Sequence, residues 1–158
     1  MGFFSYFCSM NGLNLPPYAI RVREKDGRRQ IFDFLRRKYV ALTPEEWVRQ
    51  HFVHYLVEQK GYPRGLVGNE IEVRVGEKRL RCDTVVYDRQ LRPLMIVEYK
   101  APDIELSERV IDQVMAYNAL LRVGWLVVSN GREHCCCRLE YEKKEYSFVR
   151  NIPDYEEL

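Results

Sequence analysis

The sequence lacks any apolar run long enough to cross a membrane. Its longest apolar stretches are of the type V-G-W-L-V-V at 123–128, whereas a membrane-spanning helix needs about 18 apolar residues. It also lacks a basic segment at its start, where a secretory signal carries one, because the first charged residue is Arg21. We therefore expect neither an integral membrane protein nor a secreted one.

The cysteines lack the pattern of a disulfide framework. There are five, an odd number, and three of them are adjacent at 135–137. No C-x-x-C motif occurs, and adjacent residues of a strand point to opposite faces, so a zinc site made from these cysteines with His51, His54 or His134 is disfavoured. A reducing, cytoplasmic setting is the expectation.

Two further absences concern domain organisation. No internal repeat or low-complexity linker interrupts the chain, and no G-x-x-x-x-G-K-[ST] motif for an ATP-driven motor occurs in it. The 158 residues, 46% hydrophobic and 30% charged, suit one globular domain with a core of its own. We assign residues 1–30 to an irregular N-terminal arm, in which Met10 is an alternative start, and residues 31–158 to a single domain.

Charge is nearly balanced over the whole chain but not in one segment. The net charge is +2, yet residues 21–40 carry eight Lys and Arg against three acids, a local charge of +5. Phosphate contacts require clustered cations rather than a high overall pI. The segment therefore indicates a polyanion-facing surface, with Arg36, Arg37 and Lys38 as nucleic-acid-binding candidates; a solvated loop and helix face is the alternative.

The hydrophobic pattern predicts two helices and several strands. The first helix follows Thr43 as N-cap, has Pro44 in its first turn and Glu46 to complete a capping box, and runs to about Lys60. The second, amphipathic helix spans 107–121. Alternation predicts strands at 70–75, 79–88, 93–100 and 124–131, and then a last hairpin from C-R-L-E-Y and E-Y-S-F-V.

The order of these elements predicts the fold class. Three meandering strands followed by a helix and a fourth strand imply a mixed sheet, in which the fourth strand lies parallel to the third after a right-handed connection. Both helices then cover the sheet. We expect an α/β three-layer sandwich with a mixed central sheet in α-β-β-β-α-β order and a C-terminal β-hairpin.

An acid and an amine share one surface at the end of the third predicted strand. Glu98 and Lys100 are two residues apart and so project to the same face. A register with Asp88 opposite Pro93 places Asp83 opposite Glu98. Two neighbouring carboxylates repel unless one takes a proton or a cation lies between them, and Mg²⁺ suits such a site.

Lys100 would then orient an attacking water or help to deprotonate it. The alternative is an ordinary surface ion pair of Glu98 with Lys100 or Arg81, since E-x-K alone is common. The place of the pair at the end of a very apolar central strand, where surface charge is least expected, favours a site.

Several segments resemble one known family. R-C-D at 81–83 and E-Y-K at 98–100, in this order of elements, resemble the PD-(D/E)xK nuclease superfamily. Within it, the chain from about Ile31 to Gly131 is most similar to the N-terminal nuclease domain of type I restriction enzyme R subunits. The similarity extends over T-P-E-E-W-V-R (43–49), I-V-E-Y-K-A-P (96–102), D-Q-V-M-A-Y-N (112–118) and V-S-N-G (128–131). Cys82 replaces the Pro of the first motif, at a position that varies widely in the superfamily.

The resemblance implies a restriction-endonuclease-like fold and roles for individual residues. Asp83 and Glu98 would hold Mg²⁺, with Mn²⁺ as a substitute. The Tyr99 carbonyl is often a third ligand in the family, and Lys100 would be the catalytic lysine. The family usually adds an acid from the first helix.

Two acids compete for that position. At about 100° per residue, Glu45 lies on the same stripe as Arg49 and Phe52, whereas Glu46 points away and is occupied by the capping box. Glu45 is therefore the predicted catalytic acid and metal ligand, with Arg49 as its partner and a nucleic-acid contact, in the E-x-x-x-R spacing of the family. An acid that only stabilises the helix dipole is the alternative.

Gln113 and Tyr117 are four apart and lie on one face of the second helix. In many relatives a Q-x-x-x-Y pair borders the active site, which makes Gln113 a catalytic candidate and Tyr117 a nucleic-acid-binding one. Tyr117 as a core residue is the alternative. Glu70, on one face of the first strand with Glu72, is a further acid that approaches the site.

The predicted function is Mg²⁺-dependent hydrolysis of phosphodiester bonds in DNA by an endonuclease-like domain without a motor of its own. Restriction or helicase subunits acting in trans are the candidate partners. The alternative is a catalytically inactive nucleic-acid-binding or assembly module that keeps the nuclease fold. A third interpretation is an interaction domain with no nucleic-acid role.

Overall fold

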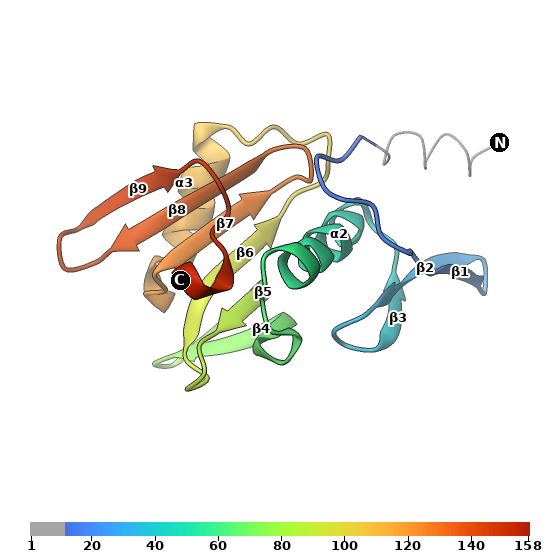
Figure 1. Cartoon of the computed structure of the whole chain (residues 1–158), viewed down its shortest axis with the longest axis horizontal. Coiled ribbons are helices and arrows are strands. Elements are labelled where there is room, and N and C mark those ends of the chain that lie inside the picture. Colours follow the sequence, from blue (N-terminus) through green and yellow to red (C-terminus); the bar gives the residue numbers. More distant parts are fainter. Residues whose placement is uncertain (1–11) are drawn as a thin grey trace.

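The computed structural model describes residues 12–158, which form a large sheet, a small sheet and two α-helices (Figure 1). The helices are α2 (Pro44–Gln59) and α3 (Glu108–Asn118). The large sheet has the strands β4 (Val67–Val75), β5 (Lys78–Tyr87), β6 (Pro93–Tyr99), β7 (Trp125–Ser129), β8 (His134–Glu140) and β9 (Glu145–Val149). Short 3-10 turns span Arg64–Leu66, Ala119–Leu121 and Tyr155–Glu157. No helix in this part of the chain is both long and apolar enough to cross a membrane.

The large sheet is mixed, as the order of elements predicts. Its strands lie in chain order from β4 to β9, and only the pair β6 and β7, joined through α3, is parallel. The C-terminal hairpin of β8 and β9 continues this sheet beyond β7. The predicted mixed sheet and its parallel pair are therefore confirmed.

The two helices pack on opposite faces of the large sheet. Side chains alternate along β6, so that Val97 joins the cluster around Phe52 of α2, while Ile96 joins the cluster around Val114 of α3. The adjacent cysteines follow the same rule in β8, because Cys136 packs on the α2 side and Cys137 on the α3 side. The domain thus consists of a helix, a sheet and a second helix in three layers.

The small sheet corrects part of the predicted N-terminal arm. Its antiparallel strands β1 (Val22–Lys25), β2 (Arg28–Asp33) and β3 (Lys38–Ala41) include most of the segment 22–30, which the sequence analysis assigns to an irregular arm. The strands are short and rich in charge, so little alternation marks them. Residues 1–11, with Met10, lie outside the described part of the chain.

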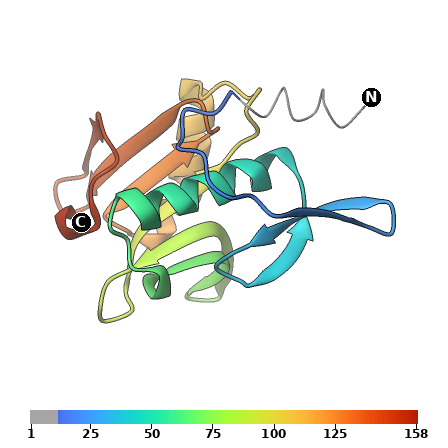
Figure 2. The same ribbon diagram turned by 45° about the vertical axis from the view of Figure 1, so that its right-hand side comes forward.

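Helix α2 lies between the two sheets (Figure 2). Its predicted N-cap is confirmed, because the Glu46 backbone N–H donates to Thr43 Oγ1 over 3.1 Å. Val48 and Phe52 pack on the large sheet, whereas Trp47 packs on Ile31 of the small sheet. Residues 46–53 are consequently all buried, and the helix has no single apolar stripe.

The hairpin of β5 and β6 keeps the predicted register near its open end and departs from it near its turn. Thr84 lies opposite Val97, as predicted. Pro93, however, lies opposite Tyr87 rather than Asp88, because the register shifts by a bulge just before Tyr87. The Asp88 carboxylate instead caps the turn by accepting backbone N–H groups of the turn residues.

Candidate active site

Two carboxyl groups meet beyond the last paired residues of β5 and β6. The register of Thr84 with Val97 makes Asp83 and Glu98 the next opposed pair, and Asp83 Oδ2 accepts the Tyr99 backbone N–H over 2.9 Å. Burial, followed by the charge and hydrogen bonding of Asp83, raises the pKa of Glu98 well above its usual range. A proton on Glu98, or a cation between the two carboxyl groups, relieves their repulsion.

Glu98 and Lys100 open into one shallow pocket of about 160 Å³ between β6 and α3. The predicted helix residues Gln113 and Tyr117 line the same pocket, with Val114 and Asn118. Four residues that the sequence analysis selects from two distant segments thus surround one hollow. Both predicted sides of the site, the strand end and the Q-x-x-x-Y face, are in contact with it.

Tyr117 is not a core residue, because 43% of it is exposed. Its hydroxyl accepts the Arg81 backbone N–H over 3.1 Å and lies 3.3 Å from the Arg81 carbonyl oxygen. Arg81 precedes Asp83 by two residues on β5. Tyr117 therefore ties α3 to the strand that carries the first acid.

The choice of Glu45 over Glu46 is wrong in its geometry. Glu45 is exposed, whereas Glu46 is only 7% exposed and is turned into the protein. The Glu46 carboxylate forms ion pairs with Arg36 and Arg49, both at 3.3 Å, and accepts from Gln50 Nε2. Glu45 is expected to face the site only if α2 has a single buried face, and α2 is buried on two faces.

Arg49 forms the centre of a buried ionic cluster. Its Nη2 lies 2.7 Å from Glu70 Oε1 and 3.6 Å from Asp83 Oδ1, and its Nη1 lies 3.3 Å from Glu46. The guanidinium is also 5.7 Å from the centre of the Tyr99 ring. Only 4% of Arg49 is exposed, which leaves no surface for the DNA contact predicted for it. The residue instead balances three acids around the site.

The basic run 36–38 is divided between a structural and an exposed part. Arg36 Nε donates to Asp33 Oδ2 over 2.6 Å, and this ion pair and the one to Glu46 occupy its head group. Arg37 and Lys38 are exposed. Of the three predicted nucleic-acid contacts, only Arg37 and Lys38 present free surface to a phosphate.

A buried polar chain that the sequence analysis missed runs beneath the site. The Tyr99 hydroxyl donates to Thr84 Oγ1, which donates to Asn69 Oδ1, and Asn69 Nδ2 donates to Asp33 Oδ2. All four side chains are buried. Thr84 and Tyr99 fall in predicted strands, but Asn69 and Asp33 fall outside them, so no pattern in the sequence marked the chain as a whole. The chain joins the large sheet to the small one and fixes the strand end that carries Glu98.

Glu70 is held in an unusual backbone conformation beside the site. Its φ is +55°, in the left-handed region that a residue with a side chain rarely adopts. Its carboxylate bridges the buried Arg49 and the exposed Arg81. Burial alone would raise the pKa of Glu70, but hydrogen bonds and charge from both arginines hold it below its usual value. Glu70 thus reaches the cluster, as the sequence suggests, but as an ion-pair partner.

The donor set fits a divalent cation only in part. Glu98 Oε1 is buried and has no hydrogen-bond partner among the described residues, and the repulsion of Asp83 and Glu98 is what a cation relieves. Within residues 12–158, however, no three His, Cys, Asp or Glu side chains are grouped to hold a metal. The predicted set of Asp83, Glu98 and Glu45 is therefore not assembled, and two carboxylates with the Tyr99 carbonyl are the available ligands.

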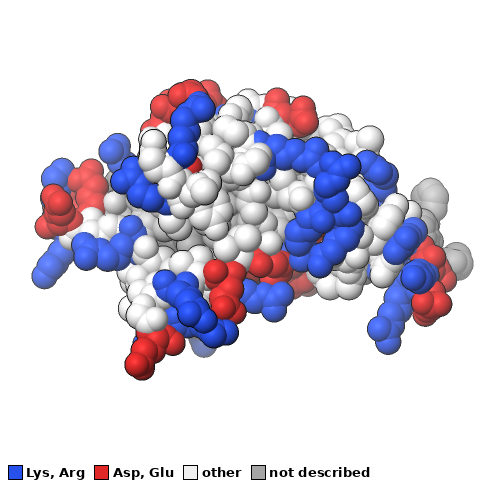
Figure 3. Space-filling view, turned by 90° about the horizontal axis from the view of Figure 1, so that it is seen from below, with Lys and Arg blue, Asp and Glu red and all other residues white. Residues whose placement is uncertain are grey.

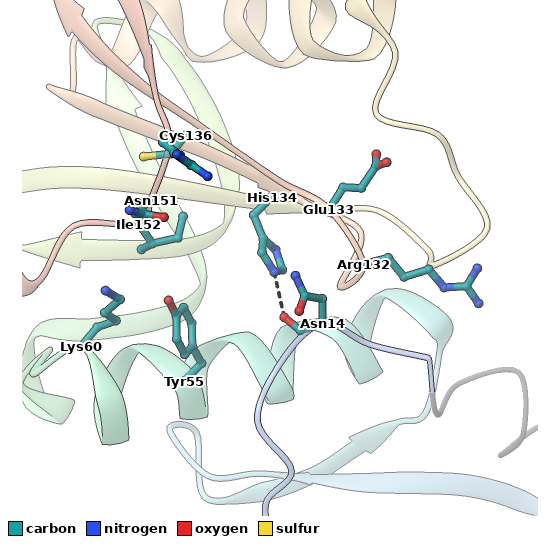
Figure 4. A pocket seen from close by; sticks show the side chains of 10 residues that line it. Asn14, Tyr55, Lys60, Arg132, Glu133, His134, Cys136, Asn151 and Ile152 are labelled. Atoms are coloured by element: carbon teal, nitrogen blue, oxygen red, sulfur yellow. Dashed lines mark hydrogen bonds between the residues drawn. The ribbon is translucent and has the colours of Figure 1, made fainter.

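A larger hollow of about 400 Å³ lies on the other side of the large sheet (Figure 4). Tyr55 and Lys60 of α2 line it with His134 of β8, whose Nε2 is 3.1 Å from the Asn14 carbonyl oxygen. Lys60 is paired with Asp154 at its rim. None of the predicted site residues borders this hollow, so the predicted chemistry belongs to the smaller pocket.

One known family matches the part of the chain that contains these residues. Residues 44–153, more than half of the chain, match the family described as type I restriction enzyme R protein N terminus (HSDR_N). This chain belongs to that family. No curated protein matches the chain. The HSDR_N match runs from α2 to beyond β9 and leaves the small sheet outside it.

A solved structure supports the fold of this HSDR_N domain. It is a fragment assigned to an HsdR subunit of a type I restriction enzyme from Vibrio vulnificus YJ016, with 18% identity and a TM-score of 0.54. The similarity covers 74% of this chain but 24% of that one. At this identity the likeness shows a common fold, and this chain spans about a quarter of the length of that relative.

Proposed function

We propose that this HSDR_N domain hydrolyses phosphodiester bonds of DNA with the help of Mg²⁺. The observation that carries the proposal is the Asp83–Glu98 pair, with its unpartnered buried oxygen, at the edge of a pocket that also contains Lys100. A restriction-endonuclease-like reaction needs this combination, a cation site beside a fixed positive charge. Membership in a restriction family supports DNA as the substrate.

Asp83, Glu98 and the Tyr99 carbonyl would hold the ion. When bound, Mg²⁺ neutralises the phosphate and lowers the pKa of a water. Lys100 would supply a positive charge to the phosphoryl oxygens as negative charge develops on them, or orient the attacking water. Gln113 and Tyr117, across the pocket, orient the water and the scissile strand. Arg49, whose Nη2 lies 3.6 Å from Asp83 Oδ1, would hold this acid in place from behind.

Plasmid nicking tests this proposal. Supercoiled DNA is incubated with the protein in Mg²⁺, Mn²⁺, Ca²⁺ or EDTA, and open circles are measured. We expect nicking with Mg²⁺ and Mn²⁺ that disappears in Asp83→Asn and in Glu98→Gln. Glu72→Gln is the matched control, because Glu72 is an exposed acid on β4 whose side chain is 55% exposed.

Each variant is first checked by its melting curve, so that loss of activity is not loss of fold. Equal nicking by Asp83→Asn and the wild type would contradict the assigned site. Equal loss in Glu72→Gln would show that net charge, rather than the carboxylate pair, matters.

A second candidate function, an inactive nucleic-acid-binding or assembly module, is favoured by one observation. The Arg49 guanidinium lies 3.6 Å from Asp83 and places a protein cation beside the acid, while among residues 12–158 no third acidic ligand is grouped with the pair. A wild type that retains DNA but never nicks it in Mg²⁺ or Mn²⁺ would support this module. In either case, we propose restriction or helicase subunits as the partners of this domain.

A further inference from the structure

The small sheet presents a basic and aromatic face to solvent. Val22 lies opposite Ile31 and Ile31 opposite Val40, and these residues pack toward Trp47 of α2. Because side chains alternate along a strand, the intervening residues point away from the helix. They include Arg21, Arg23, Lys25, Arg28, Phe32 and Tyr39, which are four cations, two aromatic rings and no acid.

Two of the arginines have their guanidinium groups over the two rings. Arg21 Cζ is 4.4 Å from the centre of the Phe32 ring, and Arg23 Cζ is 3.8 Å from the centre of the Tyr39 ring. Arg23 Nε also donates to Gln30 Oε1 over 2.8 Å. Both arginines are nevertheless exposed. Each guanidinium is therefore fixed in orientation and still offers its outer face to a ligand.

An Arg guanidinium held over an aromatic ring suits an unpaired base better than a base pair. A nucleic-acid base stacks on an aromatic ring or on an Arg guanidinium plane, and fixing that plane beforehand reduces the entropy lost on binding. In a duplex the base faces are covered by their neighbours, so only phosphates would meet this face. Along β1, Arg23 and Lys25 are two residues apart, about 6.7 Å, which is close to the separation of successive phosphates on one strand.

We propose that the outer face of the small sheet binds single-stranded DNA, with bases stacked on the Arg21–Phe32 and Arg23–Tyr39 pairs. Lys25, the next outward residue of β1 after Arg23, contacts the phosphate beyond the second base. Lys and Arg side chains also gather over the half of the molecule that holds the small sheet, in groups separated by uncharged side chains and with acidic side chains at the outer end (Figure 3). The inference rests on the proposed function for its choice of DNA and adds the form of DNA that is bound.

Binding without cleavage tests the inference. The protein carries Asp83→Asn and is kept in EDTA, and fluorescence anisotropy measures its affinity for three labelled probes of equal length. The probes are an oligothymidylate, an abasic oligonucleotide with the same phosphates, and a blunt duplex. We expect the oligothymidylate to bind at least about tenfold more tightly than the abasic strand, because each stacked base contributes a factor of about five or more. The duplex is expected to bind more weakly than the oligothymidylate.

Charge-conserving variants separate stacking from phosphate attraction. Arg21→Lys with Arg23→Lys keeps the charge but loses the flat layer, so it should lose about tenfold in affinity for oligothymidylate and little for the abasic strand. The control is Arg74→Lys with Arg79→Lys, a pair of exposed arginines facing each other on β4 and β5, which should change neither affinity.

Equal affinity for oligothymidylate and the abasic strand would overturn the inference, as would tighter binding of the duplex. An unchanged affinity of the Arg21 and Arg23 lysine variant would overturn it as well. None of these outcomes depends on nicking. A wild type that fails the plasmid assay therefore contradicts the proposed activity alone, whereas loss of the base preference contradicts the stacking surface alone.

Discussion

Arg49→Met removes the cation at the centre of the buried cluster and keeps most of the apolar stem. In the wild type, Glu46, Glu70 and Asp83 all lie within 3.6 Å of this guanidinium. Methionine leaves these three carboxylates facing one another with one cation fewer. Because Arg49 is 4% exposed, water does not replace the lost charge.

The magnitude follows from the burial of the cluster. Removing one partner of a buried ion pair costs about 3–5 kcal/mol of unfolding free energy, since a charge is left without compensation. In a domain of this size, this corresponds to a fall of about 6–20 °C in melting temperature. Arg81→Met is the matched control. It breaks the outer pair of the same Glu70, but the Arg81 side chain is 74% exposed, and we expect a loss below about 1 kcal/mol.

Urea unfolding at several pH values measures both variants. Glu70 has a folded pKa below its ordinary 4.5, so its contribution to stability is present above that value and is lost as pH falls through the lower folded pKa. Arg49→Met removes the part of this contribution that comes from Arg49 and leaves the part that comes from Arg81. The gap between variant and wild type should therefore be widest at neutral pH and shrink below about pH 4.5. A loss no larger than that of Arg81→Met, or a gap independent of pH, would refute the argument.

Three other outcomes are expected. Lys100→Ala should bind Mn²⁺ as the wild type does, yet nick plasmid more slowly by about two to four orders of magnitude, and wild-type nicking rates in this variant would exclude Lys100 from the reaction. The folded pKa of Glu98 is raised, so its contribution to the stability of the fold is complete below the ordinary pKa and is lost as pH rises toward the folded pKa. The rise in melting temperature that Mn²⁺ causes should accordingly grow between pH 6 and pH 9. A rise that does not depend on pH would argue against binding at this carboxyl. Arg37→Ala should reduce the slope of log affinity for DNA against log salt by about one unit. Arg36→Ala should instead lower the melting temperature, because it loses the ion pair with Asp33. The reverse pattern would contradict the assignment of Arg37 to DNA binding and of Arg36 to the fold.

The strand-end acids were predictable because they depend on local rules. The alternation of Glu98 with Lys100 and the register that brings Asp83 opposite Glu98 follow from strand geometry and a short turn. The register survives at the site although a bulge displaces it near Pro93, because the bulge lies at the turn and the acids lie at the other end. The Q-x-x-x-Y face was likewise readable, because Gln113 and Tyr117 are one helical turn apart.

The acid of the first helix was not predictable from that helix alone. Which residues of a helix face inward can be predicted from their spacing only when the number of covered sides is known. The small sheet that covers the second side of α2 has short, charged strands with weak alternation, so the sequence does not reveal it. Glu46 became the inward acid because Arg36 and Arg49, which are distant in sequence from each other, both reach it. A contact between α2 and the turn that joins β2 to β3 leaves no periodic mark in either segment.

The sequence by itself determined the mixed sheet, the helix caps and the pairing of Asp83 with Glu98, since each depends on neighbours in the chain or on one short connection. Tertiary structure alone decided which charges are buried. Arg37 is an exposed cation, whereas Arg49 is buried and its charge is balanced by nearby acids. The difference depends on which elements pack around each arginine. It also decided that Arg21 and Arg23 lie on aromatic rings, because those rings come from neighbouring strands whose pairing was not expected. Burial and stacking are properties of several segments together, and these are the properties on which the chemistry of this domain depends.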